Sequence, residues 1–166
     1  MDFFSEHCHG DTWYVFALIE DCLTQLRSNG TDESLSPAGI CARRLLLHIL
    51  QSFEKSISPM ADEDLSFDEF PFRHGRRDNL PARQLPSLQE IAVYVGEVKT
   101  LSLDYLSHFD DERLMDNDPL KSMESNYSRI QHAIFHAALH LGHIDQLLHD
   151  PSDPKGWDCL THRYSS

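Results

Sequence analysis

Fifteen residues toward the end of the chain read Ile130-Gln-His132-Ala-Ile-Phe-His136-Ala-Ala-Leu-His140-Leu-Gly142-His143-Ile144. Apolar residues recur in this stretch at steps of three and four, which is the periodicity of an amphipathic α-helix. At about 100° per residue, His132, His136, His140 and His143 all project within about one quarter of the helix circumference. Because imidazoles four residues apart on a helix can converge on one cation, the stretch predicts both a helix and a metal site.

Three further segments show helical periodicity, and no segment alternates like a half-buried strand. Ser36 and Pro37 form an expected N-cap and first helical residue for the second segment. The run Ser87-Leu-Gln-Glu90 fits a capping box at the start of the third segment. Trp13 belongs to the expected apolar stripe of the first. The predicted helices span about residues 12–26, 37–57, 88–109 and 120–149.

The connections between these helices indicate how they are arranged. Fewer than ten residues rich in Gly, Asp, Ser and Thr join the first two, which we expect to be antiparallel neighbours. Roughly 28 residues with four prolines separate the second helix from the third, which suits a crossover along the bundle better than a turn or another helix. The sequence therefore predicts an all-α fold, a four-helix bundle of residues 1–150 with one long crossover, followed by a polar C-terminal tail of residues 151–166.

A metal site needs a third protein ligand besides the two central histidines of the last helix. His48 is the candidate, because it is the only histidine in the body of the second predicted helix. On a helical wheel His48 lies just outside the apolar arc of its helix, His136 lies at the border of the arc on the last helix, and His140 lies inside it. Such positions on facing helices line the groove between them, where helix bundles build metal sites.

Charge and cysteine content exclude several classes of partner. The formal net charge is −13, and the only basic cluster is the short run Arg73-His-Gly-Arg76-Arg77, so we expect no nucleic-acid partner. The acidic excess also disfavours an anionic membrane surface, and no segment resembles a signal peptide or a membrane span. The four cysteines are scattered and form no C-x-x-C pair, which suits a reducing compartment. We therefore expect a cytoplasmic protein.

The histidine pattern resembles a known family. A single histidine in the second helix, His48, followed by H-x-x-x-H-x-G-x-I in the fourth, residues 136–144, is similar to the DinB/YfiT-like superfamily of metal-binding four-helix bundles, and the similarity extends over about 140 residues. The runs Leu85-Pro-Ser-Leu-Gln-Glu90 and Phe109-Asp-Asp-Glu-Arg-Leu114 also resemble that family.

The resemblance implies helices that run up-down-down-up and a divalent transition-metal ion, nickel or zinc, held by His48, His136 and His140. His143 stands where the family commonly has Gln, and His132 lies one turn before the motif. Each of these two histidines remains a candidate either for a fourth metal ligand or for a hydrogen-bond partner of one of the three ligands.

Several other metal chemistries lack their residues. A zincin protease needs H-E-x-x-H, and Ala137 occupies the position of that Glu. Di-iron bundles need Glu-x-x-His pairs from two helices plus two further Glu residues, and that combination is absent. The G-x-S-x-G, P-loop and G-x-G-x-x-G motifs are absent as well. The resemblance implies a metal-dependent thiol S-transferase or isomerase that acts with a low-molecular-weight thiol. A non-catalytic metal-binding or stress-response protein with a structural ion is the alternative, and a vestigial site is a third reading.

Three smaller features carry expectations of their own. The N-terminal His7-Cys8-His9 is a competing ligand cluster, which we interpret as incidental because adjacent residues diverge in direction. Gly142 is expected to allow close approach of a neighbouring helix. Leu47 and Phe135 are expected at outer apolar positions, where they favour a homodimer.

Overall fold

The computed structural model describes residues 2–28, 36–57, 80–119 and 123–149, and these residues form helices and no strand. The prediction of an all-α fold is confirmed. Most of the expected crossover, residues 58–79, lies outside the described residues, as do the basic cluster at 73–77 and the expected tail. The elements are α1 (Phe3–Ser28), α2 (Pro37–Ile57), the 3-10 turn η3 (Ala82–Gln84), α4 (Leu88–Ser107), α5 (Asp111–Met115) and α6 (Asn126–His149).

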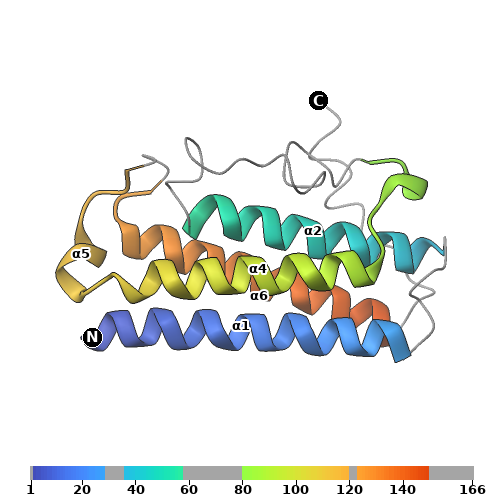
Figure 1. Cartoon of the computed structure of the whole chain (residues 1–166), viewed down its shortest axis with the longest axis horizontal. Helices are drawn as coiled ribbons and strands as arrows, with labels where there is room; N and C mark the ends of the chain where they lie inside the picture. Colours follow the sequence, from blue (N-terminus) through green and yellow to red (C-terminus); the bar gives the residue numbers. More distant parts are fainter. Residues whose placement is uncertain (1, 29–35, 58–79, 120–122, 150–166) are drawn as a thin grey trace.

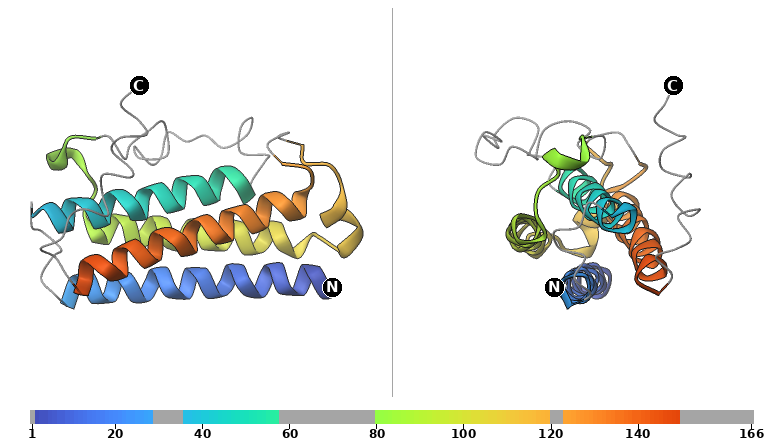
Figure 2. Two further views of the ribbon diagram at one scale, coloured as in Figure 1. Left: turned by 180° about the vertical axis from the view of Figure 1, so that it is seen from behind. Right: turned by 90° about the vertical axis from the view of Figure 1, so that its right-hand side faces the viewer.

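The four long helices lie side by side (Figure 1), with α1 and α6 pointing one way and α2 and α4 the other. The closely packed pairs are α2 with α6, α1 with α4, α1 with α6, and α2 with α4. The end-on view in Figure 2 shows α1 and α2 at opposite corners. The first two helices are therefore antiparallel, but the expectation that they are close neighbours is wrong. The eight residues between them span up to about 26 Å when extended, enough to cross the diagonal between helices packed about 8–10 Å apart.

Helix α1 begins at Phe3, nine residues before its predicted start near Thr12. Its first turn is held by contacts with other elements. The backbone N–H of Ser5 donates to the Asp111 carboxylate at 2.9 Å, and Cys8 is fully buried. Tertiary contacts thus extend a helix whose polar N-terminal sequence gave no amphipathic signal.

The starts of α2 and α4 follow their predicted caps. The Ser36 hydroxyl accepts a hydrogen bond from the Gly39 N–H at 3.1 Å. Ser87 and Glu90 form the predicted capping box, because each side chain accepts from the other residue's backbone N–H. Both caps satisfy N–H groups that a helix end would otherwise leave unpaired.

Helix α6 begins at Asn126, later than the predicted start after Pro119. The Asp118 carboxylate accepts the N–H of Met123 at 3.0 Å and lies 2.8 Å from Nε of the buried Arg129. This aspartate therefore anchors the segment before α6, and it is the Ser125 hydroxyl that accepts from the first turn of the helix.

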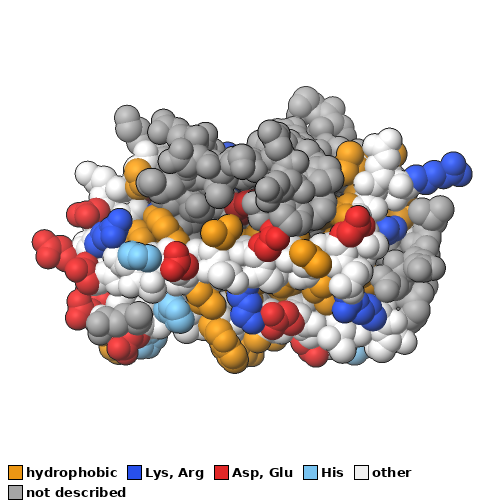
Figure 3. All heavy atoms as spheres, in the orientation of Figure 1, with side chains coloured by type: hydrophobic (Ala, Val, Ile, Leu, Met, Phe, Trp, Pro, Cys, Tyr) orange, Lys and Arg blue, Asp and Glu red, His pale blue; other side chains and the backbone are white. Residues whose placement is uncertain are grey.

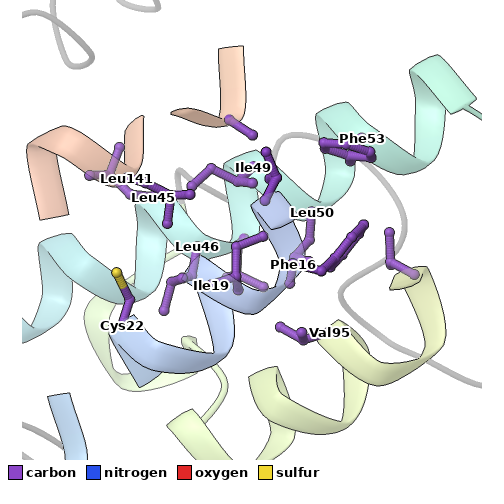
Figure 4. Close-up of a cluster of buried hydrophobic side chains, with 14 of the residues drawn as sticks. Phe16, Ile19, Cys22, Leu45, Leu46, Ile49, Leu50, Phe53, Val95 and Leu141 are labelled. Carbon is purple, nitrogen blue, oxygen red and sulfur yellow. The ribbon is translucent and has the colours of Figure 1, made fainter. Parts of the chain in front are cut away.

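The core fills the space between the four long helices (Figure 4). Helix α2 is buried on nearly all sides around its centre, where Leu45, Leu46, Leu47, Ile49 and Leu50 are all fully buried. The expected outer position of Leu47 is therefore wrong, because the buried surface of α2 extends beyond the predicted arc. Packing on nearly all sides holds this part of the α2 backbone in place.

The outer surface carries charge and some exposed aromatic residues. Acidic side chains gather at the end of the molecule where α5 lies (Figure 3). Phe135 is exposed as expected, whereas Trp13 is 53% exposed and does not belong to the buried stripe of α1. No helix within the described ranges is both long and apolar enough to cross a lipid bilayer.

Candidate metal centre

The three predicted ligands come from two adjacent helices. His48 lies on α2 between two fully buried residues, so its position is set by the core. His136 and His140 lie one turn apart on α6, which packs closely against α2. The structure brings the three histidines together although the chain separates His48 from His136 by 88 residues.

The ring nitrogens of the three histidines face one another. Nε2 of His136 lies 3.1 Å from Nε2 of His48 and 3.1 Å from Nε2 of His140. One candidate ligand atom from each residue lies within 4.8 Å of the others, and the cluster could hold a metal ion. With metal–nitrogen bonds of about 2.0–2.1 Å, two ligand nitrogens lie about 2.9 Å apart at a right angle and about 3.3 Å apart at a tetrahedral angle. The observed 3.1 Å lies between these two values.

Hydrogen bonds among the three rings alone cannot satisfy all three Nε2 atoms. A neutral imidazole nitrogen is either one N–H donor or one lone-pair acceptor. Nε2 of His136 therefore pairs well with only one of its two Nε2 neighbours at a time, although both lie at 3.1 Å. A single cation accepts all three lone pairs together, so the donor set fits a metal ion with imidazole affinity.

Burial keeps two of the three rings neutral. Burial lowers the pKa of His136 to about 4, with further lowering by positive charge on His48 and then His132. Burial likewise lowers the pKa of His140 to about 3, helped by His136, His48 and His143. Both rings are therefore deprotonated at neutral pH, which is the state that binds a metal.

The Nδ1 atoms of three α6 histidines lack partners within the described ranges. Nδ1 of His136, of His140 and of His143 is buried and has no hydrogen-bond partner among the described residues. A buried polar atom without a partner costs about 1–3 kcal/mol. When Nε2 binds a metal, Nδ1 carries the hydrogen and needs an acceptor.

The other histidines lie outside the cluster. His132 is exposed, and its ring stacks on His136 with the centroids 6.0 Å apart. His7 is exposed near the start of α1, where Nδ1 contacts the Phe3 carbonyl oxygen at 2.8 Å. Within the described ranges only His48, His136 and His140 form a group with metal-ligand spacing, and neither His7 nor His9 belongs to it.

The expected close approach of a helix at Gly142 is wrong. A Cβ placed on this residue meets no atom within 4 Å, and the residue is exposed. The glycine lies on the outer side of α6, away from the side that packs on α2 and α1. No contact in the structure explains the glycine at this position.

The cysteines of the described residues are free and unreactive. Cys8, Cys22 and Cys41 form no disulfide. Burial raises the pKa of all three thiols, to about 11 for Cys22 and about 12 for Cys41. These thiols are protonated at neutral pH and so are poor nucleophiles.

Two buried polar pairs were not predicted from the sequence. The Tyr94 hydroxyl donates to the Glu54 carboxylate at 2.5 Å between α4 and α2. Arg129 pairs with Asp118, and both side chains are almost fully buried. In the sequence, each pair is indicated only by one charged residue within a helical pattern, Glu54 or Arg129, and a single charged residue does not identify its partner.

Comparisons of the chain with protein-family models, with curated proteins and with solved structures each gave no match. The geometry of the histidine cluster is therefore the main guide to function.

Proposed function

We propose that this protein binds one divalent transition-metal ion, nickel or zinc, through His48, His136 and His140. The observation that carries the proposal is the convergence of three Nε2 atoms from α2 and α6 at successive distances of 3.1 Å. The low pKa values of His136 and His140 support it, because these rings need not lose a proton to bind at neutral pH.

The proposal includes a DinB-like fold, an up-down-down-up four-helix bundle with one long crossover. The packing of each long helix against two others supports this topology, as do the directions of the helices in Figure 1. The resemblance of the histidine pattern to the DinB/YfiT-like superfamily supports it as well.

The proposed activity is transfer or isomerisation with a low-molecular-weight thiol. A bound divalent ion lowers the pKa of a coordinated thiol or water and so supplies a nucleophile at neutral pH. The protein's own part is to hold the three neutral imidazoles on two packed helices. The raised pKa values of the described cysteines support an external thiol as the reactive group.

A non-catalytic role is the second candidate. The ligands come from both α2 and α6, so an ion would link the two helices and stabilise their packing. In this case the ion raises the melting temperature and no thiol is consumed.

Metal analysis and a thiol assay test the proposal. Purified protein, reconstituted with zinc or nickel above pH 7, is expected to bind one ion, and His48→Ala is expected to bind it at least about 100-fold more weakly. His132→Ala is the matched control, because His132 lies on the same helix outside the cluster. Metal-dependent consumption of bacillithiol, mycothiol, glutathione or coenzyme A with an electrophile supports the enzyme. Binding without turnover of any of these supports the structural role, and absence of binding refutes both.

A further inference from the structure

Two neighbouring histidine rings of α6, those of His140 and His143, each carry a buried ring nitrogen beside the candidate metal centre. Nδ1 of His140 and Nδ1 of His143 are both buried without a hydrogen-bond partner among the described residues. The two rings have centroids 5.6 Å apart and planes inclined by 58°. This separation is only slightly longer than the 4.9 Å between His48 and His140 within the cluster.

The helix geometry directs His143 toward His140. Residues three apart on a helix are neighbours on its surface. Helical side chains lean toward the N-terminus and cover the preceding turn, and the turn that precedes His143 carries His140. The influence of His143 on the pKa of His140 agrees with this closeness.

The chemistry of a ligating imidazole gives this arrangement a use. A histidine that binds a metal through Nε2 carries its hydrogen on Nδ1, and an acceptor for that N–H fixes the ring and makes it a better ligand. A neutral imidazole has one acceptor nitrogen. Among the described residues nothing accepts from Nδ1 of His140, and the His143 ring is a near neighbour.

We propose that, when His140 binds the metal ion, the half-buried His143 ring turns to accept the Nδ1–H hydrogen bond of His140 and thereby positions His140. His143 is a positioning residue and not a ligand. This inference rests on the proposed metal binding, and it identifies the residue that tunes the affinity of the site.

His132 differs from His143 in the features that matter. It is exposed, and its ring stacks on His136 at an interplanar angle of 26° with the centroids 6.0 Å apart. Nearly parallel stacked rings direct their nitrogens side by side and not toward each other. His132 therefore provides a matched control on the same helix.

The test compares zinc affinities, measured by competition with a chromogenic chelator, for wild type and four variants. His143→Ala and His143→Leu are expected to bind zinc about 10–100-fold more weakly. Leu restores volume but has no acceptor, so equal losses in both variants separate the hydrogen bond from packing. His143→Gln, whose amide oxygen can accept, and His132→Ala are expected to stay within about 3-fold of wild type.

Nuclear magnetic resonance of the zinc-loaded protein provides a readout that packing alone does not move. The Nδ1–H proton of His140 is expected to exchange slowly with water in wild type and in His143→Gln, and to exchange fast in His143→Leu. Unchanged affinity and unchanged exchange in His143→Leu would overturn the inference. The proposed metal site stands in that case provided that His48→Ala still binds zinc at least about 100-fold more weakly than wild type, whereas failure of wild type to bind zinc overturns both.

Discussion

Replacing His48 by alanine removes the only ligand that α2 contributes to the candidate centre. Loss of an outer hydrogen-bond partner of a metal ligand costs about 10–100-fold in affinity, so loss of the ligand itself is expected to cost at least about 100-fold. At saturating metal this reduces the metal-dependent stabilisation by about 2.7 kcal/mol. For a chain of 166 residues the metal-induced rise in melting temperature then falls by about 5–11 °C.

The assay is a thermal unfolding series with and without zinc or nickel for wild type, His48→Ala and His132→Ala. Comparing each variant with its own chelated form removes any effect of the substitution on the metal-free fold. His132→Ala is expected to keep the full metal-induced shift, because its exposed ring only stacks on His136. An equal shift in His48→Ala and wild type would refute the reasoning, since the ion would then be bound without α2.

Three further predictions concern stability. Asp118→Ala is expected to lower the free energy of unfolding in urea by about 3–5 kcal/mol, because it leaves the buried Arg129 guanidinium unpaired. The control Glu20→Ala removes a 47% exposed carboxylate and is expected to lower it by at most about 1 kcal/mol. Similar losses in the two variants would contradict the role of burial. The pKa of His140 is about 3 in the folded protein and about 6.5 when unfolded, so the unfolded chain binds more protons below pH 6.5, and stability falls as the pH drops from about 6.5 toward 3. At pH 5 the protonation of this residue on unfolding lowers the free energy of unfolding of the metal-free protein by about 2 kcal/mol. A His140→Gln variant whose stability falls equally with acid would contradict this prediction. Gly96→Ala is expected to stabilise α4 by about 0.5–1 kcal/mol, because a Cβ there meets no atom within 4 Å; a lower melting temperature would show an unrecognised constraint.

The sequence predicted those features that local chemistry decides. The caps at Ser36 and Ser87 depend on residues within one turn, and helical periodicity depends on residues three or four apart. The pairing of His136 with His140 follows from the same short spacing. His48 could be selected because its helix offered one histidine near the border of an apolar arc.

The remaining features depend on partners far away in the chain, which one sequence does not reveal. The first turn of α1 is held by Asp111, more than a hundred residues later. The helical wheel predicts an outer position for Leu47 because it describes one helix by itself and does not include the neighbouring elements that bury the residue. The pairing of Asp118 with the buried Arg129, eleven residues later, could not be inferred from either residue alone. The unpaired Nδ1 of His143 likewise becomes visible only when burial is known.

The most direct test of the proposed centre is X-ray absorption spectroscopy at the metal edge of the zinc-reconstituted protein. The geometry predicts three imidazole nitrogens at about 2.0–2.1 Å from the ion in wild type and two in His48→Ala. Identical imidazole numbers in the two proteins, or no bound zinc in wild type, would contradict the account.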